Sequence, residues 1–138
     1  AAVSEETLQR WNNEGHVQWL GHVSDMPGLL AKSHVVVLPT YYREGIPLSL
    51  IEAASCGLPL VTTNSPGCSE IVRDQENGFL ITARDSDQLA NAILKLIDNK
   101  NLRLEMGRRS RKIVEDEFSS EIIDQLYLKE YENLLTRA

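Results

Sequence analysis

Apolar residues follow two patterns that alternate along the chain: short continuous runs, which are typical of strands, and spaced positions, which are typical of helices. Residues 34–39 (HVVVLP) form an unbroken, mostly β-branched run ended by a proline, a pattern typical of a strand covered on both faces of a parallel sheet. Shorter strands are predicted at residues 16–21 (HVQWLG), 59–63 (PLVTT) and 79–82 (FLIT). Because helical segments separate these strands, we expect an α/β fold with a Rossmann-like, mainly parallel sheet of about four strands and flanking helices.

The first helical segments carry start and stop signals. Ser4 is a predicted N-cap followed by acidic residues, and Gly15 ends this helix. Residues 24–33 (SDMPGLLAKS) form a second capped segment. Pro47 and Gly57 bracket a third helix of about ten residues, the asymmetry of proline at the start and glycine past the end that helices favour.

The second half of the chain is predicted to be mainly helical. Residues 85–100 have Asp85 or Ser86 as a capping residue and apolar residues on one face, as in an amphipathic helix. The C-terminal helices, about 102–138, are expected to break near residues 115–121 (EDEFSSE), where Ser119 or Ser120 caps the last helix.

Length and composition narrow the functional classes. The 138 residues suit one domain, 1–138, with its own core. A net charge of −6 disfavours nonspecific nucleic-acid binding, which needs a concentrated basic surface. No run approaches the roughly 20 apolar residues that span a bilayer, so membrane contact of the full-length protein is expected to be peripheral, at the inner face.

Cysteine and histidine positions give no metal signature. Cys56 and Cys68 lack CxxC spacing, and His16, His22 and His34 share no ligand spacing with them. We therefore expect no metal site and a reducing, cytoplasmic setting.

The stretch EGIPLSLIEAASCGLP, residues 44–59, holds the candidate chemistry. With Pro47 at the helix start, the N–H groups of Leu48, Ser49 and Leu50 are expected to lack intrahelical partners and to point along the positive end of the helix dipole. Such an end binds phosphate.

Two carboxylates flank this predicted anion site. Glu44 precedes Gly45, which allows close approach of a ligand, and Glu52 lies further along the helix with its side chain leaning toward the N-terminus. Carboxylates accept hydrogen bonds from hydroxyls, so a phosphate between two such groups favours a sugar nucleotide. In the alternative interpretation, Glu44 is a surface loop charge and Glu52 an exposed helix residue.

The sequence around these residues resembles a known family. Residues 35–72 (VVVLPTYYREGIPLSLIEAASCGLPLVTTNSPGCSEIV) are similar to the C-terminal, donor-binding half of retaining GT-B glycosyltransferases, the glycosyl transferases group 1, with their E-x7-E motif at Glu44 and Glu52. The resemblance extends from about Val17 to Leu135.

The resemblance implies roles for individual residues. Glu44 would be the catalytic-site glutamate that contacts the transferred sugar, and Glu52 would hold the ribose hydroxyls. Main-chain groups would face the sugar and diphosphate at Gly45, Ile46, Leu48 and Ser49. The loop that contacts the base would consist of His22, Val23 and Ser24.

The resemblance also implies missing parts. Relative to the family, the acceptor-binding N-terminal domain, the diphosphate-binding arginine and lysine, and the first two donor-domain strands precede this chain. The family's strand order, 3-2-1-4-5-6, then leaves residues 16–20 without a neighbour. We expect this strand to pair directly with residues 34–38, or the chain to exchange elements in a dimer.

The resemblance predicts the donor-binding part of a retaining hexosyltransferase. It would bind a UDP or GDP sugar without a metal or other cofactor and transfer the hexose to a polysaccharide, lipid or small-molecule hydroxyl, the acceptor being held mainly by the missing domain. The fragment alone is expected to be inactive. Two alternatives remain: a sugar-nucleotide epimerase or hydrolase of the same fold, and a noncatalytic α/β module that binds a nucleotide or a protein.

Overall fold

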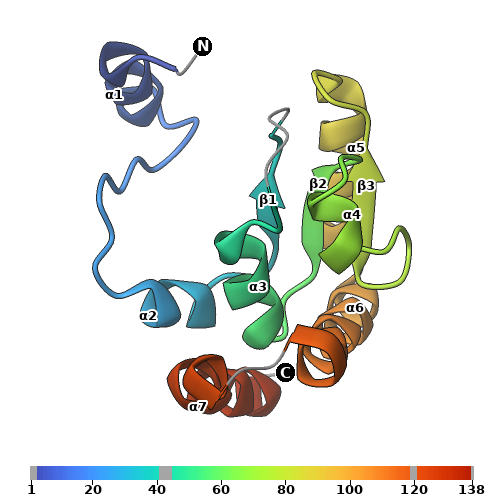
Figure 1. The fold of residues 1–138 in the computed structure, drawn as a ribbon. Coiled ribbons are helices and arrows are strands. Elements are labelled where there is room, and N and C mark those ends of the chain that lie inside the picture. Colours follow the sequence, from blue (N-terminus) through green and yellow to red (C-terminus); the bar gives the residue numbers. More distant parts are fainter. Residues whose placement is uncertain (1–2, 41–44, 119–120, 138) are drawn as a thin grey trace.

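A parallel sheet of three strands forms the centre of the computed structural model, which describes residues 3–40, 45–118 and 121–137 (Figure 1). The strands are β1 (Val36–Leu38), β2 (Leu60–Thr63) and β3 (Gly78–Ile81), in the order β1-β2-β3. Val37 lies opposite Val61, which lies opposite Phe79. This order is the one that the family resemblance implies for the last three strands.

The strand predicted at residues 16–21 is absent, and the sheet has three strands, so the expectation of about four strands is wrong. Residues 16–20 form no strand and run through the irregular segment between α1 (Glu5–Asn13) and α2 (Met26–Ala31) (Figure 1). The direct pairing with residues 34–38 is therefore also wrong. A strand is held by ladder hydrogen bonds to a neighbour, and here the Trp19 N–H donates instead to Asn12 Oδ1 at 2.8 Å. Exchange of elements in a dimer stays a prediction.

Helices cover both faces of the sheet. On one face, α3 (Leu48–Ser55) and α4 (Cys68–Ile71) contribute to a core that also contains Leu60. On the other face, α5 (Ser86–Ile97) packs against a second core cluster around Val61. Both faces of β2 are thus covered, and all four of its residues are buried. In β1, the strand formed by the apolar run 34–39, the three residues are only half-buried, so the prediction that both faces of this strand are covered is met only in part.

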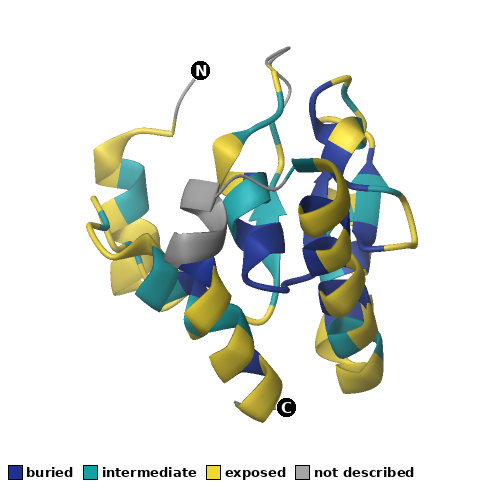
Figure 2. Cartoon of the chain, turned by 60° about the horizontal axis from the view of Figure 1, so that its bottom comes forward, coloured by how far each residue is buried: buried dark blue, intermediate teal, exposed yellow. Residues whose placement is uncertain are grey.

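The N-terminal helices α1 and α2 have N-terminal caps, but few of their residues are buried. Ser4 accepts a hydrogen bond from the Thr7 N–H at 3.2 Å, as predicted for an N-cap. The cap of α2 is Asp25, the second residue of the predicted segment. No residue of α1 is buried, and Figure 2 shows the buried residues concentrated on the sheet and on the helices against it.

The C-terminal region breaks where the sequence predicted. Helix α6 (Lys100–Ile113) continues into a π-helical segment, Val114–Phe118, and α7 (Glu121–Arg137) follows. Ser119 and Ser120, the predicted caps, lie outside the described residues. Helix α7 packs on α2 and α3 (Figure 1). Of the helices that the structure describes, none is long and apolar enough to cross a membrane.

Candidate functional site

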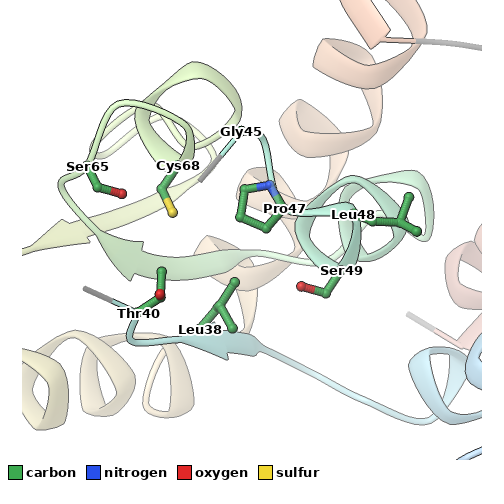
Figure 3. Close-up of a pocket in the computed structure, with 8 residues that line it drawn as sticks. All are labelled: Leu38, Thr40, Gly45, Pro47, Leu48, Ser49, Ser65 and Cys68. Atoms are coloured by element: carbon green, nitrogen blue, oxygen red, sulfur yellow. The ribbon is translucent and has the colours of Figure 1, made fainter. Parts of the chain in front are cut away.

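A cavity of about 270 Å³ opens at the carboxyl ends of β1 and β2. In parallel sheets ligands bind at this edge, so the cavity lies where the fold predicts a site. Its lining residues, drawn in Figure 3, are Leu38, Thr40, Gly45, Pro47, Leu48, Ser49, Ser65 and Cys68. They come from the ends of two strands and from the loops and helix starts that follow.

Threonine side chains tie the two strand ends together beneath the cavity. The Thr62 hydroxyl donates to the Leu38 carbonyl at 2.8 Å, and the Thr63 hydroxyl donates to the Thr40 carbonyl. Both threonines are buried, so water does not compete for these hydrogen bonds. They hold the start of the loop after β1 against the end of β2, which fixes the base of the site.

The N-terminus of α3 forms one wall. Pro47 is its N-cap and supplies no side-chain hydrogen bond. The amides of Leu48 and Ser49 make no hydrogen bond to another described residue, whereas the Leu50 N–H donates to the Pro47 carbonyl at 3.1 Å. The prediction that the Leu50 amide is available is therefore wrong, because the first turn closes tightly. Two amides remain directed out of the positive end of the helix.

The opposite wall comes from the loop after β2 and from the start of α4. Ser65 is half-buried and Cys68 is buried, and both side chains lie across the cavity from Pro47 (Figure 3). Ser65 and Thr40 were not predicted as site residues from the sequence, although both lie on loops that follow predicted strands. None of the described lining residues carries a charge, so the cavity offers neutral hydrogen-bonding groups and the helix end.

The predicted site residues divide between the cavity and its surroundings. Gly45, Leu48 and Ser49 line it. Ile46 packs with its half-buried side chain against the core. Glu44 lies outside the described residues, so its predicted contact with the sugar stays a prediction.

Glu52 lies one turn further along α3, on the side of the helix that carries Leu48 and Ser49. It is half-buried, and its Oε2 accepts a hydrogen bond from the Tyr127 hydroxyl of α7. Burial, and then this hydrogen bond, raise the pKa of Tyr127 above its ordinary value. Glu52 is thus an ordered carboxylate beside the cavity, which argues against its interpretation as a freely exposed helix residue.

The predicted base-contacting loop lies elsewhere. His22, Val23 and Ser24 belong to the irregular segment between α1 and α2 (Figure 1). They are not among the residues that line the cavity. Their role stays a prediction. Within the described ranges, no group of three His, Cys, Asp or Glu residues is arranged to hold a metal ion.

Comparison with known proteins identifies a family. The family of glycosyl transferases group 1 matches residues 3–113. An N,N'-diacetylbacillosaminyl-diphospho-undecaprenol alpha-1,3-N-acetylgalactosaminyltransferase of Campylobacter jejuni is 32% identical over 123 residues, covering 89% of this chain and 32% of its own length. The capsular polysaccharide biosynthesis glycosyltransferase CapM of Staphylococcus aureus is 39% identical over 108 residues, covering 78% of this chain and 28% of its own. The chain thus spans about a third of the length of these relatives.

Solved structures give the same result for the fold. HepE of Anabaena in complex with UDP superposes with a TM-score of 0.76 at 27% identity, over 95% of this chain and 35% of that one. The C-terminal domain of a glycosyl transferase group 1 family protein, LpcC of Francisella tularensis, superposes with a TM-score of 0.72 at 24% identity, over 85% of this chain and 63% of that one. The three strands and their helices therefore have the architecture of a GT-B C-terminal domain.

Proposed function

The chain belongs to the glycosyl transferases group 1, and from this premise we propose that it binds the nucleotide-diphosphate-sugar donor of a retaining hexosyltransferase. The observation that carries the proposal is the cavity at the carboxyl ends of β1 and β2, closed on one side by the start of α3, whose N-cap Pro47 makes no side-chain hydrogen bond. A diphosphate fits such a wall, because two amides and the helix dipole favour negative charge there.

The proposed donor is a UDP-hexose. HepE of Anabaena, which is similar to this chain, has been solved with UDP and with UDP-glucose. In our proposal the amides of Leu48 and Ser49 bind the diphosphate, while Gly45 allows the sugar to approach the main chain. Glu52 accepts hydrogen bonds from the ribose hydroxyls, and Glu44 contacts the transferred hexose.

The chemistry proposed for these residues is charge stabilisation. As the bond between the sugar and the diphosphate breaks, negative charge grows on the leaving diphosphate. The fixed amides at the start of α3 stabilise that negative charge without having to reorient. Further positive charge and the acceptor site are assigned to parts of the full-length protein outside this chain. A relative acts on an undecaprenol-linked acceptor, which supports a cytoplasmic location at the inner membrane face.

Calorimetric titration tests the proposal. The chain is titrated with UDP, GDP, ADP and UDP-glucose, and the titrations are repeated with Glu52→Ala. We expect binding of UDP and UDP-glucose, weakened roughly tenfold or more by the substitution, because a hydrogen bond to a charged group contributes about 1.5–3 kcal/mol. Glu70→Ala removes an exposed glutamate of α4 and the same unit of charge, and should leave the affinity unchanged.

Two results would contradict the proposal. A folded chain that binds none of these nucleotides has no donor site of its own. Equal loss of affinity in Glu52→Ala and Glu70→Ala would show that the loss is not specific to Glu52, and so that Glu52 makes no ribose contact.

A further inference from the structure

The carboxylate of Glu52 is held by a residue far along the chain. Tyr127 is 4% exposed, and its hydroxyl donates to Glu52 Oε2 across 75 positions of sequence. We propose that Tyr127 is a positioning residue, which orients the Glu52 carboxylate for the ribose hydroxyls of the donor. This inference rests on the proposed function of Glu52, and it adds a residue of α7 to the donor site.

A second tyrosine sets the position of α7 on α3. Tyr131 lies one helical turn after Tyr127, and its ring covers Gly57, where an added Cβ would come within 2.5 Å of ring carbon Cδ1. The Arg111 guanidinium lies over the same ring, 5.2 Å from its centroid, and donates to the Ser55 carbonyl at 2.8 Å. Because these contacts are made at the C-terminal end of α3, they place the Tyr127 hydroxyl one turn back, at Glu52.

The pairing leaves the carboxylate able to bind a sugar. An ionised carboxylate offers about four acceptor positions, and the tyrosine hydroxyl occupies one of them. The remaining positions can accept the two ribose hydroxyls. A glutamate that is already held in one rotamer loses less conformational entropy when the ribose binds, so the hydrogen bond preorganises the site. A phenol is protonated at neutral pH even at its ordinary pKa, and burial raises the pKa of Tyr127 further, so its hydroxyl is the donor that this role needs.

Removing one hydroxyl from the protein and two from the ligand tests the inference. Calorimetry is used to measure the affinity of the wild-type chain, Tyr127→Phe, Glu52→Ala and the double variant for UDP and for 2′,3′-dideoxy-UDP. Tyr127→Phe keeps the buried ring. Tyr131→Phe is the matched control, because the contacts of Tyr131 with Gly57 and Arg111 involve its ring. Thermal unfolding followed by circular dichroism establishes that each variant is folded.

The expected results form a pattern. Tyr127→Phe should weaken UDP binding about five- to tenfold, a change near 1–1.4 kcal/mol, and should leave dideoxy-UDP binding unchanged. Tyr131→Phe should change neither affinity. In the Glu52→Ala background, Tyr127→Phe should have no further effect on UDP, since the group that it orients is gone.

Other results would overturn the inference. If Tyr127→Phe leaves UDP binding unchanged or tightens it, the tyrosine does not orient the carboxylate or competes with the ribose for it. If it weakens UDP and dideoxy-UDP equally, its role is only structural. If the wild-type chain does not prefer UDP to dideoxy-UDP, or Glu52→Ala keeps that preference, the proposed function of Glu52 fails first, and the inference fails with it.

Discussion

Asn77 connects three elements behind the candidate site, and its replacement should lower the free energy of unfolding. Its side-chain amide donates to the Ile71 carbonyl at 2.8 Å, and its Oδ1 accepts from the Arg73 N–H at 2.8 Å. Its own carbonyl accepts from the Leu60 N–H at 3.1 Å and from the Ser110 hydroxyl at 3.3 Å. Asn77 therefore joins the end of α4, the start of β2 and the middle of α6.

The expected magnitude follows from the two side-chain bonds. Asn77→Ala removes both while Asn77 is fully buried, so water cannot replace them. A buried polar group left without a partner costs about 1–3 kcal/mol. With one donor and one acceptor stranded, the free energy of unfolding should fall by about 2–5 kcal/mol. For a chain of this size, that corresponds to a decrease in Tm of roughly 6–15 °C.

Urea denaturation followed by circular dichroism measures this change. Asn91→Ala is the control, because Asn91 is exposed in the middle of α5 and alanine favours helices. The control should change stability by no more than about 0.5 kcal/mol. A loss below about 1 kcal/mol in Asn77→Ala, or equal losses in the two variants, would refute the reasoning that these two hydrogen bonds stabilise the turn.

Three further predictions concern the sheet, a buried thiol and a helix cap. Gly78→Ala would place a Cβ 1.7 Å from the Leu60 carbonyl oxygen, so β2 and β3 would have to separate. The free energy of unfolding, measured in urea, should therefore fall by about 3 kcal/mol. An unchanged free energy of unfolding would contradict the close approach of the two strands. Burial raises the pKa of the Cys56 thiol from 9.0 to about 12, so the unfolded chain releases this proton first as pH rises. Stability should therefore fall between about pH 9 and about pH 12, by up to about 1.4 kcal/mol per pH unit, and Cys56→Ala should reduce that slope in urea titrations; an equally steep variant would assign the slope to other groups. Asp85→Ala removes the acceptor for the Gln88 N–H at 3.0 Å and should cost about 1 kcal/mol, seen as a decrease in Tm of about 3 °C, whereas Asp85→Asn should retain most of the stability.

Elements with local signals could be predicted from the sequence. Helix α3 begins after Pro47 and ends before Gly57, where the chain turns with φ of +75°. Helix α5 begins after Asp85, one of the two residues predicted as its cap. In these cases a few neighbouring residues decide the outcome, since a cap, a proline or a glycine acts through its own backbone and the next turn.

The candidate site could be predicted in part. The cavity lies at the edge of the sheet where strands of this fold bind ligands, and it contains three of the predicted residues, Gly45, Leu48 and Ser49. The walls formed by Thr40 and Ser65 were not predicted individually. Their loops follow different strands, and only the pairing of β1 with β2 brings them together.

By itself, the sequence determined the α/β alternation, the start of α3 and the E-x7-E motif, because each depends on residues close together in the chain. Tertiary structure alone decided that residues 16–20 remain outside the sheet and that Glu52 meets Tyr127. A strand needs hydrogen bonds from a neighbour, and a contact across 75 positions needs α7 packed on α3. Both depend on which distant surfaces meet, and no local pattern of residues carries that information.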